Sequence, residues 1–236
     1  MSDWKVHPHR PLVQVLPGLW SLTGSLPTLP LPRNMVLWRL GDGRIVVHSA
    51  VCVDDARLSE IQALGPLAFL LVPNQGHRQD APAWKSRFPD IVVISPRNAR
   101  AKVQEVIPVE AHCEDVLPPL GVACLVPPGF KEGYELVYDV PVDGGRALVI
   151  NDVLANGEKF PGFKGMMLGL FGVPGGGFGR ARIVNLSFGK NRGAFRPFVE
   201  QLAARTDLVA MTVSHGPPIV GAEAVRAALA HAASRL

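Results

Sequence analysis

The chain of 236 residues has few cysteines, few aromatic side chains and little charge. Its three cysteines, Cys52, Cys113 and Cys124, are odd in number and show no Cys-x-x-Cys spacing. This pattern argues against both a disulfide framework and a cysteine zinc site. Charged residues make up 19% of the chain and hydrophobic residues 47%, so the sequence can bury a large core and is not expected to be disordered.

Several sequence signals of particular functions are also missing. No basic-then-apolar leader and no uncharged apolar run of roughly 18 residues occurs, which predicts a cytoplasmic protein without a membrane partner. The net charge is +4, and short basic clusters such as 97–102 contain no aromatic residues that could stack on bases. We therefore expect no nucleic-acid partner. No Gly-x-Ser-x-Gly motif supports a serine hydrolase.

The apolar runs that are present predict one layered α/β domain over residues 1–236. In the first half, strands are expected at 35–40, 44–50, 67–73 and 91–95, with helices after Asp54 and over 80–88. Strands at 122–128, 135–141 and 146–152 are separated only by turns, which favours an antiparallel meander. A helix near 194–202, a strand at 208–214 and a final helix follow. The Gly- and Phe-rich stretch 159–190 lacks periodicity and is predicted to be a functional loop that covers a pocket.

Three polar groups follow predicted buried strands directly. His77 comes after 67–73, Asp152 ends 146–152, and His215 comes after 208–214. Parallel neighbours in a sheet would bring such strand ends to a common edge. Two imidazoles and one carboxylate are sufficient ligands for a zinc or iron ion with open positions. Spacing alone leaves the alternative that each is a turn or capping residue.

Six segments, in order, resemble the metallo-β-lactamase-like hydrolases over nearly the whole chain. They read LPGLW (16–20), MVLWRLGDGRIVVHSA (35–50), NQGHRQD (74–80), PPGFKEGYELVYDV (127–140), ALVINDVLANG (147–157) and VSHGPPIVG (213–221). The resemblance implies a four-layer αββα sandwich with metal ions held between loops at one edge of two sheets. Asp152 resembles the bridging aspartate of that family, and His215 with Gly216 resembles its final His-Gly pair.

The chain departs from that family at most of the metal-ligand positions. The family motif His-x-His-x-Asp-His, set with its first histidine at Asn74, places Gly76, Arg78 and Gln79 at the other ligand positions and His77 at a spacer. In the next motif, Phe130 stands where the family has a histidine. A two-metal site cannot form from these residues, and the fixed charge of Arg78 opposes a divalent ion.

Two readings of this degenerate site remain. In the first, His77, Asp152 and His215 hold one zinc or iron ion, and the protein is a metal-dependent hydrolase with a small-molecule substrate. The Asn-x-x-His element followed by Trp and Phe-Pro resembles a less-studied branch of the superfamily in this respect. Asp80 or Asn74 would orient the attacking water, and Asp152 would act as ligand or base.

In the second reading no metal binds and the protein is not catalytic. Arg78 then pairs with Asp152, and the pocket takes an anionic ligand, or the apolar segment 163–178 contacts a protein partner. His48 lies near the position of an aspartate that supports the metal centre in the family. It is predicted either to hydrogen-bond a ligand or to be a buried histidine bonded to backbone.

Overall fold

The computed structural model describes residues 3–25, 32–130, 134–157, 172, 177–181 and 191–236. Its strands are β1 (Val13–Leu16), β2 (Leu19–Ser25), β3 (Pro32–Arg39), β4 (Ile45–His48), β5 (Leu67–Leu71), β6 (Val92–Ser95), β7 (Ala111–His112), β8 (Ala123–Leu125), β9 (Val137–Val142), β10 (Gly145–Val149), β11 (Ala155–Gly157), β12 (Gly177–Gly179), β13 (Leu208–Thr212) and β14 (Ile219–Val220). Its α-helices are α1 (Asp55–Ala63), α2 (Ala81–Arg87), α3 (Arg100–Val103), α4 (Cys113–Val116), α7 (Arg192–Ala203) and α8 (Ala222–Ser234). Short 3₁₀ helices are η1 (Gln75–His77), η2 (Arg97–Ala99) and η3 (Pro118–Leu120).

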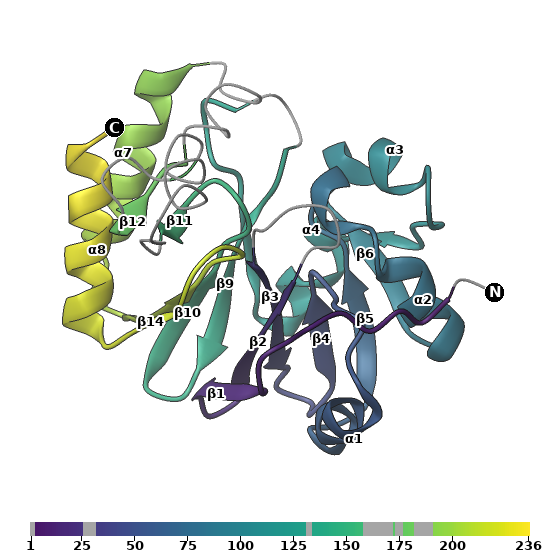
Figure 1. Cartoon of the computed structure of the whole chain (residues 1–236). Coiled ribbons are helices and arrows are strands. Elements are labelled where there is room, and N and C mark those ends of the chain that lie inside the picture. Colours follow the sequence, from purple (N-terminus) through teal and green to yellow (C-terminus); the bar gives the residue numbers. More distant parts are fainter. Residues whose placement is uncertain (1–2, 26–31, 131–133, 158–171, 173–176, 182–190) are drawn as a thin grey trace, which may run out of the picture.

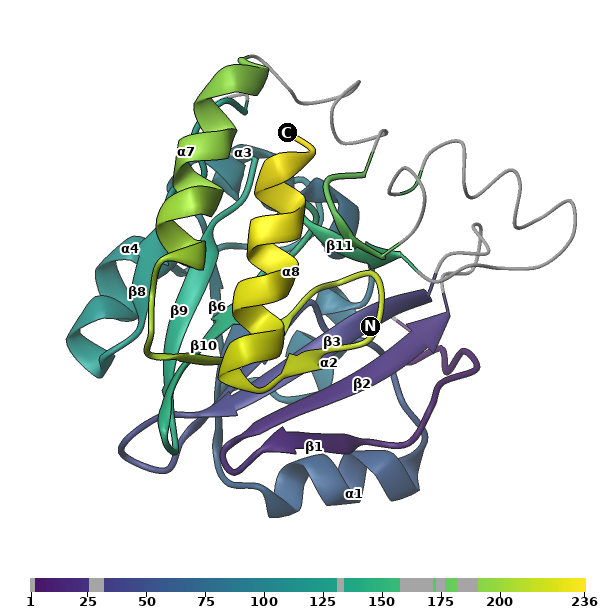
Figure 2. The same cartoon turned by 90° about the vertical axis from the view of Figure 1, so that its left-hand side faces the viewer.

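The strands form two large sheets that pack face to face, with helices on both outer faces (Figure 1). The first sheet has the order β1-β2-β3-β4-β5-β6-β7, and the second has the order β14-β13-β10-β9-β8. Helices α1 and α2 cover the first sheet, while α7 and α8 lie side by side over the second (Figure 2). The predicted four-layer αββα sandwich is therefore confirmed.

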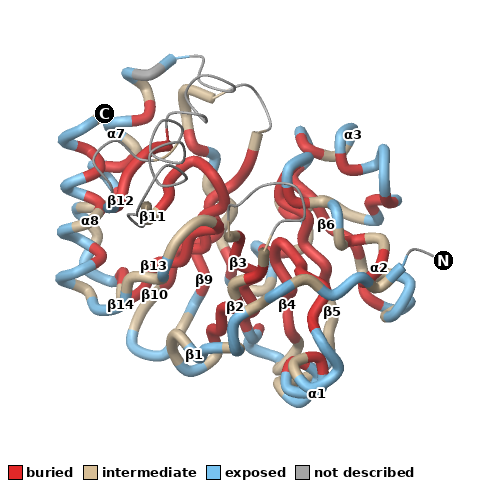
Figure 3. The backbone as a smooth tube through the Cα atoms, in the orientation of Figure 1, coloured by how far each residue is buried: buried red, intermediate tan, exposed pale blue. Residues whose placement is uncertain are grey.

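Alternating side chains on single strands build the three interfaces between these layers. On β3, Met35 and Leu37 pack toward the helices of the first layer, whereas Val36 and Trp38 pack between the sheets. On β10, Ala147 and Val149 face the intersheet core and Leu148 faces α7 and α8. This period of two is the geometry of an extended strand that is buried on both faces. Figure 3 shows the buried backbone concentrated in these central strands.

Strand direction decides which loops meet at the edge of the sandwich. In the first sheet β4, β5, β6 and β7 run parallel, and in the second sheet β10 and β13 run parallel. The segments β8, β9 and β10 form the predicted antiparallel meander. Chain segments that leave the carboxyl ends of β5, β10 and β13 carry the site described below.

Most of the Gly- and Phe-rich stretch 159–190 lies outside the described residues, so its predicted covering role stays a prediction. Within it, Phe178 on β12 is buried against α7 and α8. Phe178 itself is therefore not exposed to a partner, and the predicted contact of segment 163–178 with a protein partner stays a prediction. Among the described residues, no helix combines the length and the apolar character that crossing a bilayer requires.

Candidate metal centre

His77, Asp152 and His215 converge from three separate parts of the chain. His77 ends η1 after β5 of the first sheet, while Asp152 and His215 follow β10 and β13 of the second. One nitrogen or oxygen atom from each residue lies within 4.8 Å of the others. The expectation of strand neighbours in a single sheet is wrong in one respect, because His77 reaches the site across the intersheet boundary. The site therefore joins the two sheets.

The distances within this group suit ligands that share one ion. His77 Nε2 lies 3.1 Å from Asp152 Oδ1, and His215 Nε2 lies 3.2 Å from the same oxygen. Two ligand atoms at ~2.1 Å from a tetrahedral ion are separated by about 3.4 Å. The spacings from Asp152 Oδ1 to the two imidazoles are close to that value, and all three donor atoms lie within 4.8 Å of one another.

Hydrogen bonding fixes which ring nitrogen of His215 faces the site. His215 Nδ1 lies 2.8 Å from the carbonyl oxygen of Pro32, which can only accept. Nδ1 therefore carries the proton, and the lone pair of Nε2 points toward Asp152 whenever the ring is neutral. Two lone pairs would repel each other at 3.2 Å, so the pair needs either a proton or a metal ion between its atoms. This donor set fits a divalent metal ion.

His77 is oriented by Ser49, the residue that follows β4. Ser49 Oγ lies 2.7 Å from His77 Nδ1, and this contact leaves Nε2 directed at Asp152. Among the described residues, Ser49 is the one residue other than glycine with a positive φ, at 55°. A left-handed backbone at a non-glycine residue costs on the order of 1–3 kcal/mol and is concentrated at functional sites.

The second carboxylate oxygen of Asp152 is held by two neutral donors. Asn74 Nδ2 donates to Asp152 Oδ2 at 2.9 Å, and the hydroxyl of Tyr134 donates to the same oxygen at 3.1 Å. Asn74 Oδ1 in turn accepts from the Gly76 backbone N–H, which fixes the amide orientation. Asp152 thus presents Oδ1 to both imidazoles.

Charges within the group keep Asp152 ionised despite its burial. Desolvation raises the pKa of Asp152, but the charges and hydrogen bonds of His77 and His215 outweigh it and hold that pKa well below its ordinary value. Burial lowers the pKa of His215, yet the hydrogen bond and charge of Asp152 leave it above the usual value. The site is therefore a buried carboxylate that attracts positive charge.

Glu135 holds the backbone that carries Asp152. Its carboxylate accepts from the N–H of Asp152 at 2.8 and 3.0 Å and from the N–H of Val153 at 3.0 Å. Burial, followed by the charge of Asp152, raises the pKa of Glu135 to about 8. The side chain of Glu135 thus supplies acceptors for two buried backbone N–H groups that would otherwise be unsatisfied.

Phe130 and His48 flank the group without bonding to it. Phe130 stacks on Tyr134 with ring centroids 6.3 Å apart and meets Phe195 edge-on, so the aromatic that replaces a family histidine supports Tyr134. His48 is fully buried beside Trp38, and neither of its ring nitrogens has a hydrogen-bond partner among the described residues. His48 is therefore buried, as one of its two predicted roles requires, but within the described part of the chain it makes neither the predicted hydrogen bond to a ligand nor the predicted bond to backbone.

Arg78 and Asp80 point away from the three converging side chains. Arg78 Nη1 lies 2.7 Å from Glu105 and also bonds to the Lys102 carbonyl, so its predicted pairing with Asp152 is wrong. The side chain leaves η1 toward the surface, where a carboxylate partner is available. Asp80 pairs with buried Arg33 and accepts from the Cys52 N–H at 3.1 Å. Its role in orienting water stays a prediction.

Sequence reasoning missed Ser49, Tyr134 and Glu135. Glu135 carries one readable signal, because a carboxylate two residues before the apolar strand β9 must be either exposed or paired. Tyr134 and Ser49 carry none, since a hydroxyl contact across the fold and a positive φ have no local pattern.

Comparison with solved structures identifies the fold. The metallo-β-lactamase FIM-1 from Pseudomonas aeruginosa, in its mono-zinc form, matches with a TM-score of 0.59 and 15% identity over 99% of this chain and 98% of that one. A metallo-β-lactamase from Erythrobacter litoralis, with β-mercaptoethanol in its active site, matches with a TM-score of 0.60 and 17% identity over 95% and 96% of the chains. A metallo-β-lactamase from Hirschia baltica matches with a TM-score of 0.56 and 15% identity over 94% of this chain and 97% of that one.

Neither a protein-family model nor a curated protein sequence matches the chain. The structural matches extend over nearly the whole of this chain and of the compared chains, and at this level of identity they show a shared fold. This chain has the metallo-β-lactamase fold, as its sequence motifs predict.

Proposed function

We propose that the chain binds one divalent metal ion, zinc as in the mono-zinc FIM-1 structure, and acts as a metal-dependent hydrolase. His77, Asp152 and His215 would hold the ion, in place of the larger ligand set of the family. The convergence of their three donor atoms within 4.8 Å carries the proposal. Iron is the alternative ion for this mixture of imidazole and carboxylate ligands.

The surrounding hydrogen bonds support a preorganised ligand set. Pro32 fixes the tautomer of His215, and Ser49 contacts His77 on the nitrogen that faces away from Asp152. Metal-ligating histidines are usually oriented by a partner on their second nitrogen. The two contacts are therefore the kind that a metal site requires.

A bound zinc ion supplies Lewis acidity, which lowers the pKa of water to about 7 and polarises a carbonyl or phosphoryl oxygen. Asp152 Oδ1 faces both imidazoles, so it would serve either as a ligand of the ion or as the base that takes up a proton. Tyr134 keeps its phenolic proton at neutral pH, because burial and the charges of Asp152 and Glu135 raise its pKa. It is placed to donate a hydrogen bond at Asp152 Oδ2.

Metal analysis of the full chain tests the binding step. Protein purified without a histidine tag and loaded with zinc should retain close to one equivalent after dialysis. Substituting any ligand, as in His77→Ala, Asp152→Ala or His215→Ala, should weaken zinc binding by more than about 100-fold, because three ligands are the minimum that a catalytic zinc site uses. The control His231→Ala removes a histidine on α8, remote from the site, and should change nothing.

Hydrolysis is tested separately on the loaded protein. A panel of a β-lactam, a lactone, a thioester and a phosphodiester covers the chemistries found on this fold. Two results together support the proposal: turnover is lost in Asp152→Asn, and turnover of the unchanged protein is lost on chelation and restored by zinc. Zinc retention in all three ligand variants would contradict the metal site, whereas tight zinc binding without turnover of any substrate would contradict the hydrolase alone.

A further inference from the structure

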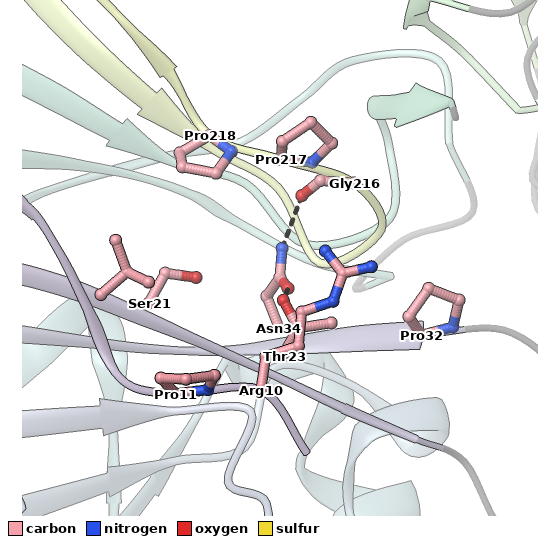
Figure 4. Close-up of a pocket in the computed structure, with 10 residues that line it drawn as sticks. Arg10, Pro11, Ser21, Thr23, Pro32, Asn34, Gly216, Pro217 and Pro218 are labelled. Atoms are coloured by element: carbon pink, nitrogen blue, oxygen red, sulfur yellow. Dashed lines mark hydrogen bonds between the residues drawn. The ribbon is translucent and has the colours of Figure 1, made fainter. Parts of the chain in front are cut away.

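A cavity of about 140 Å³ lies beside Gly216, Pro217 and Pro218, and none of the three proposed ligands lines it (Figure 4). Ser21 and Thr23 of β2 and Asn34 of β3 form its floor. Its walls are the N-terminal segment around Arg10 and the loop that follows His215. No part of the proposed function uses it.

Strand alternation and one asparagine create the cavity. Leu22 and Met35 point into the core under the helices, so their neighbours Ser21, Thr23 and Asn34 face the opposite side of the sheet. There, Asn34 Nδ2 donates to the carbonyl oxygens of Val213 and Gly216, both at 2.7 Å. These bonds hold the loop of residues 214–218 above β3, and the cavity lies beside this bridge.

The lining is apolar apart from a few groups that favour an anion. Four prolines and Val13 supply most of the walls, and no acidic residue lines the cavity. Arg10 forms no ion pair with any described carboxylate, and Figure 4 shows its guanidinium reaching toward Gly216 and Pro217. The hydroxyl of Ser21, a residue that is only 6% exposed, makes no hydrogen bond to another described residue.

We propose that this cavity binds a small monocarboxylate. The guanidinium of Arg10 would pair with the carboxylate, the hydroxyl of Ser21 would donate to it, and the prolines with Val13 would cover a short aliphatic or aromatic body. At ~30 Å³ per water molecule, the volume corresponds to about five waters, which suits a ligand of a few heavy atoms. Arg10 is exposed to solvent and lines the cavity without an acidic neighbour there, and the planar fork of an arginine is a usual recognition element for a carboxylate.

The cavity adjoins the ligand group without being part of it. Pro32 lines the cavity and also accepts the hydrogen bond from His215 Nδ1. Gly216 and the two prolines that follow it belong to the loop that carries His215. A carboxylate in the cavity would therefore contact the back of a ligand-bearing loop, and its binding requires no metal ion.

Calorimetric titration of zinc-free full chain with butyrate tests the proposal at constant ionic strength. Butyrate should bind saturably, with a dissociation constant on the order of millimolar, and the neutral isostere butyramide should bind at least about tenfold more weakly. Arg10→Gln should weaken butyrate binding by about tenfold or more, and Arg10→Glu should abolish it. Ser21→Ala should weaken it by a few fold, since one neutral hydrogen bond is lost.

Arg226→Gln is the matched control, because it removes the same unit of charge at an exposed arginine of α8 that does not line the cavity. Its butyrate affinity should equal that of the unchanged protein. The proposal would be overturned by any of three results. These are butyrate binding by Arg10→Gln as tight as by the unchanged protein, butyramide binding as tight as butyrate binding, and no saturable binding of butyrate. Binding that appears only with zinc and disappears in Asp152→Ala would place the carboxylate at the metal, which would overturn the cavity site and leave the proposed function standing.

Discussion

At the scale of single residues, the candidate site depends on small polar groups. Their backbone conformation and position limit which residue can stand there more than their hydrogen-bonding chemistry does. Ser49 combines a left-handed backbone with a hydrogen bond to His77. The backbone conformation and the hydrogen bond can be separated by substitution, because alanine removes only the hydroxyl, whereas glycine also relieves the conformational cost.

Ser49→Ala should weaken zinc binding by roughly 10- to 100-fold, the usual effect of losing a group that orients a ligand. Ser49→Gly should weaken it similarly but unfold at a higher urea concentration than Ser49→Ala, because glycine adopts a φ of 55° without strain. Zinc affinity is measured by competition with a chromophoric chelator, and stability by urea unfolding. Unchanged zinc affinity in Ser49→Ala would show that His77 needs no orienting partner.

At the scale of elements, the turn after β10 is held in place by β9 and its approach. Glu135 stands two residues before β9 and accepts the backbone N–H groups of Asp152 and Val153. Four residues further on, Asp139 lies within β9 and pairs with Arg146 at 2.6 Å and Arg205 at 2.7 Å, away from the ligands. Comparing these two buried acids can separate the positioning of Asp152 from the general stability of the fold.

Glu135→Ala should leave buried N–H groups unsatisfied, at a cost of about 1–3 kcal/mol for each, and should also weaken zinc binding by displacing Asp152. Glu135→Gln keeps one accepting oxygen and should restore part of both losses. The control Asp139→Ala should lower the unfolding free energy, because Arg146 loses its paired carboxylate and Arg205 keeps only Asp207, while zinc affinity stays constant. If Glu135→Ala lost stability alone, Glu135 would have no positioning role.

At the scale of the whole molecule, the two sheets are joined both by their apolar faces and by the ligand group. His48 lies at the end of β4 between these sheets, against Trp38 and Tyr138. Burial and, to a smaller extent, the charge of His77 lower the pKa of His48 from 6.5 to about 3, although the charge of Asp152 acts in the opposite direction. The folded protein therefore keeps this imidazole neutral where the unfolded chain would protonate it.

The unfolded state binds the extra proton between pH 6.5 and about 3, so His48 makes stability fall as the pH falls through that window. Each pKa unit corresponds to ~1.4 kcal/mol, and the total is on the order of several kcal/mol. His48→Leu should flatten the acid side of a stability–pH profile measured by urea unfolding of zinc-free protein. His231→Leu, an exposed control on α8, should leave the slope unchanged, and equal slopes for all three proteins would refute the burial argument.

Local pattern was sufficient for most of the fold. The Asp54 cap, the alternation on β3 and β10 and the turns of the meander each follow from a few neighbouring residues. The candidate ligands could also be found, because His77, Asp152 and His215 each follow an apolar strand directly. The direction of Arg78 could not, since a long side chain beside a strand end can turn either to the site or to Glu105.

The sequence by itself determined a layered α/β chain and the three strand ends where polar ligand types occur, because hydrophobic periodicity and residue chemistry are local properties. The four-layer αββα arrangement of those layers was implied by the resemblance of its motifs to the metallo-β-lactamase-like hydrolases. Only the tertiary structure decided that His77 crosses from one sheet to meet Asp152 and His215 of the other, within 4.8 Å. It also decided the supporting contacts of Ser49, Tyr134 and Glu135 and the cavity beside Arg10. These depend on how two separately formed sheets pack, and packing joins atoms that are far apart along the chain.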